Sequence, residues 1–260
     1  MTCSGITAAG KQDKDMDTEQ KKRKQICVMT GASGGIGSAL LEILAERYDK
    51  IYRIGKTFHP GARAGKCEMT DVLCDLTDMS DIEKAIGSVE ESEVDILVNC
   101  AGTAYYGVSD SIGSRFIKEM VDVNVTAPMV LTSALLPRIK KAKGTVVFVS
   151  SILARKEAST HAAVYGASKK ALSFYAASLF EEMRKHDVRV MTVCPDVTDT
   201  GLYRNADFGV GGEPDNTLDP ADVAEALRFA LDQRPGMCVT EIVLRPQKNA
   251  IKKKQRTDRK

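Results

Sequence analysis

The sequence lacks the marks of a disulfide framework, a metal centre or a membrane anchor. Its seven cysteines are odd in number, scattered and without a C-x-x-C pair, which favours a reducing compartment. Its three histidines lack the local spacing of a zinc site. No run of about 18 apolar residues occurs, and the N-terminal residues contain no apolar core of signal-peptide length. We therefore expect a cytoplasmic protein with no bound metal and no membrane partner.

An excess of one charge is also missing. The 260 residues include 37 Lys and Arg against 35 Asp and Glu, a formal net charge of +2, which gives no reason to expect a nucleic-acid partner. Basic residues do gather in residues 1–24 and 251–260, and we expect both segments to be solvated tails. Nuclear targeting or contact with an anionic surface is the alternative. Residues 25–250 contain no repeat and no linker, so we expect them to form one domain.

Between these tails, short apolar runs alternate with helical patterns. The apolar runs indicate strands over residues 26–30, 50–55, 95–102, 144–151, 188–195 and 239–246. Helical periodicity covers residues 38–48, 81–91, 115–143, 165–186 and 219–233. Strands that are apolar throughout and separated by helices predict a mainly parallel, doubly wound α/β sheet flanked by helices. Pro128 follows Asn124 by four residues, so we expect a kink or backbone irregularity near Asn124.

A glycine-rich turn, TGASGGIG at residues 30–37, follows the first expected strand and precedes a helix. Gly31 would let the chain turn tightly, whereas Gly35 and Gly37 would allow close approach of a pyrophosphate and of the helix to the sheet. The amides that open the helix would face the anionic phosphates. This context predicts a dinucleotide site in a Rossmann-type fold, and we count Ser33 and Ile36 of the turn among its cofactor-binding residues.

The end of the second expected strand carries information on the choice of cofactor. Sites for NAD usually have an acidic residue there, which binds the ribose hydroxyls. The run IYRIGKT, residues 51–57, has none, and Lys56 stands where a cation would meet the extra phosphate of NADP. Arg53 is a weaker candidate because it lies inside the strand. We therefore expect NADP, with NAD as the alternative.

Tyr165 and Lys169 are four residues apart on an expected helix, which puts both on one face. A free tyrosine has a pKa of about 10, and a nearby ammonium favours the phenolate and lowers that pKa. Tyr165 would then act as the general acid in a reduction or as the general base in an oxidation. Ser150 and Ser151 end a strand upstream, where a hydroxyl would hydrogen-bond the substrate oxygen.

Taken in order, these motifs resemble those of the short-chain dehydrogenase/reductase family over residues 24–246. The glycine turn resembles that family's TGxxxGxG motif, and NCAG at residues 99–102 resembles its NNAG motif. CDLTD, residues 74–78, resembles the segment that contacts adenine, and PDVTDT, residues 195–200, resembles the PGxVxT stretch beside the nicotinamide. The family's Asn-Ser-Tyr-Lys tetrad is matched by Asn124, Ser151, Tyr165 and Lys169.

The resemblance implies an NAD(P)-dependent oxidoreductase that moves a hydride between a nicotinamide cofactor and a small-molecule carbonyl or secondary alcohol. Tyr165 would exchange the substrate proton, Lys169 would lower its pKa and hold the nicotinamide ribose, and Ser151 would orient the substrate oxygen. Asn124 would tie Lys169 to a chain of waters. Besides the glycine turn and Lys56, the implied cofactor-binding residues are Asp75, Leu76, Asn99, Ala101, Gly102, Tyr165, Lys169, Pro195, Thr198 and Thr200.

The sequence departs from the family pattern at three places. Cys100 replaces the second Asn of NNAG, which we expect to alter packing more than chemistry. Asp196 replaces the Gly of PGxVxT and would put a carboxylate near the nicotinamide, or point it to solvent. The interval from Ser151 to Tyr165 is one residue longer than usual, so Ser150 is the alternative for the serine role.

Three expectations concern the surroundings of this site. Residues 201–217 have four glycines and few apolar residues, so they would form a mobile loop over the substrate or a plain surface connection. Within them, Tyr203 and Phe208 would touch the substrate or anchor the loop. The helices around Asn124 and Tyr165 are apolar beyond one stripe, which predicts a homodimer or homotetramer. A non-catalytic dinucleotide sensor or scaffold on the same fold is the alternative function.

Overall fold

The computed structural model of this protein describes residues 23–59, 66–210, 213–248 and 251–253. Seven of its strands form one parallel sheet in the order β3-β2-β1-β4-β5-β6-β8. These strands are β1 (Ile26–Thr30), β2 (Lys50–Gly55), β3 (Glu68–Leu73), β4 (Ile96–Asn99), β5 (Thr145–Val149), β6 (Arg189–Pro195) and β8 (Glu241–Leu244). The order reverses between β1 and β4, and ligands of such sheets bind outside the carboxyl ends of the strands at this point.

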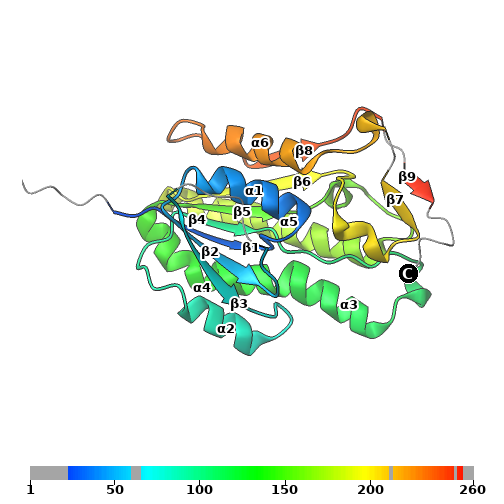
Figure 1. The fold of residues 1–260 in the computed structure, drawn as a ribbon, viewed down its shortest axis with the longest axis horizontal. Helices are drawn as coiled ribbons and strands as arrows, with labels where there is room; N and C mark the ends of the chain where they lie inside the picture. Colours follow the sequence, from blue (N-terminus) through cyan, green and yellow to red (C-terminus); the bar gives the residue numbers. More distant parts are fainter. Residues whose placement is uncertain (1–22, 60–65, 211–212, 249–250, 254–260) are drawn as a thin grey trace, which may run out of the picture.

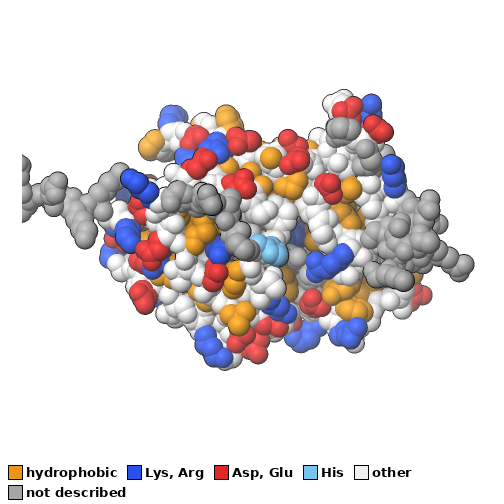
Figure 2. Space-filling view, viewed as in Figure 1, with side chains coloured by type: hydrophobic (Ala, Val, Ile, Leu, Met, Phe, Trp, Pro, Cys, Tyr) orange, Lys and Arg blue, Asp and Glu red, His pale blue; other side chains and the backbone are white. Residues whose placement is uncertain are grey.

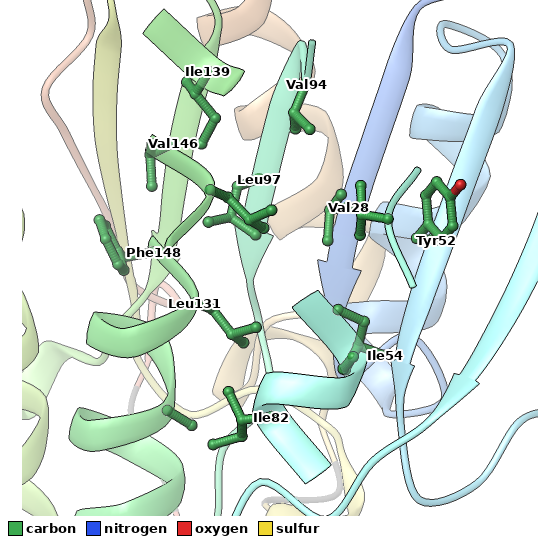
Figure 3. Close-up of a cluster of buried hydrophobic side chains, with 14 of the residues drawn as sticks. Val28, Tyr52, Ile54, Ile82, Val94, Leu97, Leu131, Ile139, Val146 and Phe148 are labelled. Atoms are coloured by element: carbon green, nitrogen blue, oxygen red, sulfur yellow. The ribbon is translucent and has the colours of Figure 1, made fainter. Parts of the chain in front are cut away.

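Helices cover both faces of this sheet, as predicted. One face is covered by α1 (Gly35–Ala45) and α6 (Pro220–Leu231), and the other by α2 (Met79–Gly87), α4 (Ala127–Ala142) and α5 (Ala163–Met183) (Figure 1). The core on the second face packs Leu97 and Phe148 of the sheet against Ile82 of α2 and Leu131 of α4 (Figure 3). Charges of both signs are mixed over the surface in view (Figure 2). The predicted doubly wound, single-domain fold is confirmed.

The expected irregularity near Asn124 is present. The run predicted as one helix is α3 (Ser114–Val121), a π-helical turn over Asp122–Thr126, and α4. Pro128 lies in the first turn of α4, directly after the π turn, and it lacks the N–H that would donate to the preceding turn. The whole run is long and apolar enough to cross a membrane. Its residues Leu131 and Ile139 are fully buried against the sheet, so we assign it as a core helix of this fold.

The C-terminal segment differs from its prediction as a tail. Ile251–Lys253 forms strand β9, which pairs antiparallel with β7 (Phe208–Val210) of the expected mobile loop (Figure 1). The pairing satisfies backbone groups of both segments, which neither could do alone. Residues 1–22 and 254–260 of the predicted tails lie outside the described residues. Arg23, next to the first of them, is held by a bidentate ion pair with Asp95.

Five short 3-10 helices complete the described chain. They are η1 (Ser109–Ser111), η3 (Ile152–Arg155), η4 (Arg184–His186), η5 (Gly201–Asn205) and η6 (Pro214–Asn216). Two of them, η3 and η5, follow the carboxyl ends of β5 and β6 and therefore lie beside the predicted site. The loop at residues 201–217 thus contains η5, β7 and η6, so its described residues are more ordered than their composition indicated.

Candidate functional site

The glycine turn packs closely against the segment that follows β4. Gly31 has a φ of 73°, and a Cβ atom there would lie 2.6 Å from the amide nitrogen of Ala101. A Cβ on Gly37 would collide with the carbonyl oxygen of Gly31, so α1 begins directly against the turn. A Cβ on Gly35 would lie 2.7 Å from the Cγ2 atom of Thr200. The structure thus brings together three predicted segments that lie far apart in sequence, and only glycine fits at these approaches.

The segment after β4 is tied to β1 by Thr30. The Thr30 hydroxyl accepts hydrogen bonds from the amides of Cys100 at 3.2 Å and Ala101 at 3.1 Å. Asn99 is buried, and its side-chain amide donates to Thr132 of α4 at 3.2 Å, while its side-chain oxygen has no hydrogen-bond partner among the described residues. Burial raises the pKa of the Cys100 thiol to about 12, so it stays protonated and packs as a small apolar group, as expected.

Two of the residues predicted to contact the adenosine end of the cofactor are joined to each other. The Lys56 ammonium lies 2.8 Å from a carboxylate oxygen of Asp75. Partial burial opposes ionisation of Asp75, but Lys56 and two hydrogen bonds from Thr77 hold its pKa below the usual value. The hydroxyls of Ser33 and Thr57 lie 3.4 Å apart on neighbouring turns. Hydroxyls and an ammonium at this end suit an additional phosphate group.

Two other residues considered at this end, Arg53 and Leu76, are buried. Arg53 is buried and makes a bidentate ion pair with Asp71 at 2.6 and 2.8 Å, so it is committed to the sheet edge. This agrees with its ranking below Lys56. Leu76 is also buried and belongs to the hydrophobic core on the α2 side of the sheet. In the part of the chain that the structure describes, no three His, Cys, Asp or Glu side chains gather as they would around a metal ion.

Tyr165 and Lys169 lie on one face of α5, next to the carboxyl end of β5. The Lys169 ammonium is 6.0 Å from the centre of the Tyr165 ring and donates to the carbonyl oxygen of Val149 at 2.9 Å. Both side chains are buried, and burial lowers the pKa of Lys169 to about 8. Burial raises the pKa of Tyr165, although a hydrogen bond with Ser151 acts in the opposite direction. The expected lowering of the Tyr165 pKa is therefore absent in this arrangement, because burial outweighs a lysine turned toward Val149.

The two candidate serines have different partners. Ser151 shares a hydrogen bond with Tyr165, and its hydroxyl accepts from the amide of Leu153 at 3.2 Å. Ser150 instead donates to the carbonyl oxygen of Lys169 at 3.0 Å and lies 2.7 Å from the Ser173 hydroxyl. Ser150 therefore joins β5 to α5, while the hydroxyl beside the tyrosine belongs to Ser151.

Asn124 is fully buried in the π turn and bonds to the segment after β4. Its carboxamide accepts from the amide of Thr103 at 3.0 Å and donates to the Thr103 carbonyl at 2.9 Å and to Ser168 at 3.1 Å. A Cβ on Gly102 would lie 3.3 Å from the Lys169 nitrogen and 3.4 Å from the Asn124 carboxamide oxygen. Asn124 and Lys169 thus meet against Gly102, and the chain of waters between them stays a prediction.

The carboxylate of Asp196 does not point to solvent, which was one of its two expected positions, and its place near the nicotinamide stays a prediction. It is buried, 3.2 Å from Arg245 of the segment after β8, and it accepts the amide of Val197. It is therefore paired with Arg245 and buried away from solvent. Pro195 ends β6, and the hydroxyl of Thr198 donates to the Asp196 carbonyl oxygen at 3.0 Å.

One residue near Tyr165 was missed in the sequence. The ring centre of Tyr106 lies 5.8 Å from that of Tyr165, 6.0 Å from Tyr203 and 5.0 Å from Phe208. The sequence feature that could have indicated Tyr106 is the aromatic pair at residues 105–106, which follows the NCAG motif. Tyr203 and Phe208 therefore pack against Tyr106, the ring that in turn contacts Tyr165.

Known proteins share this architecture. A sequence profile described as short chain dehydrogenase matches residues 25–208, more than half of the chain. The chain belongs to this family. The short-chain dehydrogenase is 29% identical over 232 residues to an uncharacterized oxidoreductase of Staphylococcus saprophyticus, with 85% of this chain and 97% of that one covered. The resemblance found in the sequence motifs is confirmed, and the family places the protein among the oxidoreductases.

Two solved structures are similar to this short-chain dehydrogenase. One is an alcohol dehydrogenase from the archaeon Thermococcus sibiricus in complex with 5-hydroxy-NADP, with a TM-score of 0.76, 24% identity, and coverage of 85% and 96% of the two chains. The other is a metagenomic short-chain oxidoreductase in complex with NADP, with a TM-score of 0.72, 26% identity, and coverage of 85% and 97%. The first likeness bears on the fold alone.

Proposed function

We propose that this short-chain dehydrogenase transfers a hydride between NADP and a carbonyl or secondary alcohol, with Tyr165 as the general acid or base. The observation that carries the proposal is the course of residues 101 and 102. Ala101 lies against Gly31 of the glycine turn, and Gly102 lies against Lys169. A dinucleotide whose phosphates lie at the turn would therefore reach the tyrosine and lysine with its other end.

The residues present fit a dinucleotide cofactor. The N-cap of α1 is Gly34, which has no side chain to cap the first amides, so these amides and the helix dipole favour an anionic phosphate there. Lys56, Ser33 and Thr57 offer an ammonium and two hydroxyls for the additional phosphate of NADP. The NADP complex of the metagenomic relative supports this choice. When bound, the cofactor supplies or accepts the hydride at its nicotinamide.

The chain's own residues would handle the proton. In the reductive direction, the carbonyl carbon gains a hydride while the Tyr165 hydroxyl gives its proton to the carbonyl oxygen, and Tyr165 regains a proton from water. Ser151 would donate a hydrogen bond to the same oxygen and hold it near Tyr165. With its pKa near 8, Lys169 keeps most of its positive charge at pH 7 and stabilises a phenolate that forms during the reaction.

The test is a panel of ketones and aldehydes with NADPH or NADH, followed by loss of absorbance of the reduced cofactor. The expected result is turnover with a preference for NADPH and a loss of at least about a hundredfold in kcat for Tyr165→Phe. Tight binding of the cofactor without turnover on any carbonyl would instead favour the non-catalytic sensor or scaffold. Turnover that survives Tyr165→Phe would refute the role of the tyrosine.

A further inference from the structure

A cavity of about 330 Å³ lies at the amino ends of β1, β4, β5 and β6, and we call it the amino-edge cavity. The proposed site lies at the other end of these strands (Figure 1). At a rise of about 3.3 Å per residue, the five residues of β5 separate the two ends by about 16 Å. The amino-edge cavity is therefore distinct from the proposed site. Its lining includes Gln25, Arg47, Tyr48, Asp95, Lys143 and Arg189.

Arg189 is the cation in this cavity that is most available to a ligand. It opens β6, is half-buried, and donates one N–H to the carbonyl oxygen of Leu231 at 3.3 Å, at the end of α6. A guanidinium carries five N–H groups. In the part of the chain that the structure describes, the others have no hydrogen-bond or ion-pair partner. Capping α6 thus uses one donor, and the unused donors of a half-buried guanidinium indicate a place for an anion.

Tyr48 lies beside Arg189 in the same cavity. Burial raises the pKa of the Tyr48 phenol, while the charges of Arg47 and Arg189 act in the opposite direction, so both guanidinium groups lie near it. The phenol therefore stays protonated and keeps its donor. Its hydroxyl has no hydrogen-bond partner among the described residues. Arg47 is less available than Arg189, because it bonds to Asp232.

The carboxylate in the lining, that of Asp95, would not repel an anion strongly. Arg23 holds it through two hydrogen bonds at 2.6 and 3.0 Å, and it also accepts the amide of Ile26 at 2.7 Å. Lys143 lies 2.8 Å from Asp187, and both side chains of this pair are more than 60% exposed. Exposed pairs of this kind are weak, so the Lys143 ammonium can also turn to an anion in the cavity.

We propose that the amino-edge cavity binds a small phosphate monoester through Arg189 and Tyr48, with Lys143 at its mouth. The guanidinium fork matches two phosphate oxygens and the phenol can donate to a third, whereas a carboxylate has two oxygens in all. The cavity is larger than a phosphate group and lies at the lower end of the range for ligand sites, about 300–1,000 Å³. Because its lining is mostly polar, the rest of the ligand would carry hydroxyls, as in a sugar phosphate.

The test is isothermal titration calorimetry of the full chain with glucose 6-phosphate. NADP is kept at saturation throughout, so that the added phosphate does not enter the cofactor's place. We expect a Kd below about 1 mM, and no binding of glucose, which lacks the phosphate. Arg189→Gln should raise this Kd at least about tenfold, because it removes a charged donor. Tyr48→Phe, which removes only the hydroxyl, should raise it about three- to tenfold.

The matched control is Arg184→Gln. Arg184 is an exposed arginine of η4 that pairs with Glu181 and does not line the cavity, so the Kd should stay within about twofold. Circular dichroism checks that Arg189→Gln is folded, since Arg189 also caps α6. Should this variant fail to fold, Tyr48→Phe decides the question on its own.

Three results would overturn the inference. One is the absence of binding by the wild type. Another is binding that neither Arg189→Gln nor Tyr48→Phe weakens, which would place the ligand elsewhere on the molecule. The third is glucose or citrate binding as tightly as glucose 6-phosphate, which would show that the cavity does not recognise a phosphate. Because all proteins are compared at the same concentration of NADP, failure of the proposed hydride transfer would leave this test unaffected.

Discussion

Replacing Lys56 tests the choice of cofactor most directly. The side chain is 61% exposed and already bonded to Asp75, so its charge is partly screened and partly committed. A hydrogen bond to a charged group contributes about 1.5–3 kcal/mol, and these two conditions favour the lower end of that range. We therefore expect Lys56→Ala to raise the Kd for NADPH about tenfold, since about 1.4 kcal/mol corresponds to a factor of ten. The Kd for NADH should change less than twofold, because NADH lacks the additional phosphate.

Asp75→Asn gives the complementary measurement. The exposed ion pair with Lys56 contributes about 0.2–1 kcal/mol, which a bound phosphate has to compete with. Removing the carboxylate charge should therefore tighten NADPH binding up to about fivefold, and only while Lys56 is present. Both Kd values can be measured by titrating the fluorescence of the reduced cofactor. Lys84→Ala, which removes an exposed lysine paired with Asp81, is the matched control. Equal losses for NADPH and NADH in Lys56→Ala, or tighter binding of NADH by the wild type, would refute the reasoning.

Four further predictions address the proton chemistry, the C-terminal strand and the assembly. Ser151→Ala should lower kcat by about a hundredfold, whereas Ser150→Ala should lower the free energy of unfolding by about 1 kcal/mol with little effect on activity. Steady-state kinetics and urea unfolding measure the two effects, and the opposite outcome would exchange the roles of the two serines. The pKa of Lys169 is near 8 in the folded protein and 10.5 in the reference state, so the unfolded chain binds more protons between these values and stability rises with pH there. The free energy of unfolding of the wild type, compared with that of Lys169→Met, should rise by about 1.4 kcal/mol per pH unit across this window, as measured by urea unfolding. A difference that does not change with pH would show that the pKa of Lys169 is not shifted. Deleting residues 251–260 removes the partner of β7 and should raise KM for the ketone while the Kd for NADPH stays constant; a matching loss in both would indicate general unfolding instead. We also propose a homodimer or homotetramer in which the 75% exposed ring of Phe174 on α5 is covered, so Phe174→Glu should reduce the sedimenting mass, and a monomeric wild type would exclude this.

The parts of the site that could be predicted from the sequence are those set by local backbone geometry. Gly31 is needed where φ is positive, and Tyr165 and Lys169 share a helix face because of the helical period. The backbone irregularity at Asn124 was predictable from Pro128, which lies within one turn of it. These patterns depend on neighbours within a few residues, so they are visible without knowledge of the fold.

Contacts between distant segments were not predictable in this way. β3 was missed because its residues are mixed in polarity and lie at the sheet edge, where one face is exposed. The bond between Lys56 and Asp75 depends on how two turns face each other. Asp196 has its partner on the segment after β8, 49 residues away, and no local pattern indicates which way its carboxylate turns. The fold class therefore followed from periodicity, whereas the charges available at the site did not.

The contrast between local geometry and distant contacts also bears on which substrates the protein accepts. The residues assigned to the cofactor and the proton lie at or beside the carboxyl ends of strands in a buried parallel sheet. A methyl group on Gly31 or Gly37 would meet backbone atoms there. Tyr203 and Phe208 belong to a 3-10 helix and a three-residue strand. Their segment is held by the short pairing of β7 with β9 and by Lys248, which bonds to Asp215. Exchanging these rings disturbs few core contacts, so substitutions there should cost little stability. We therefore propose that selectivity for the substrate can change through residues 201–210 while the residues assigned to the cofactor and the proton stay the same.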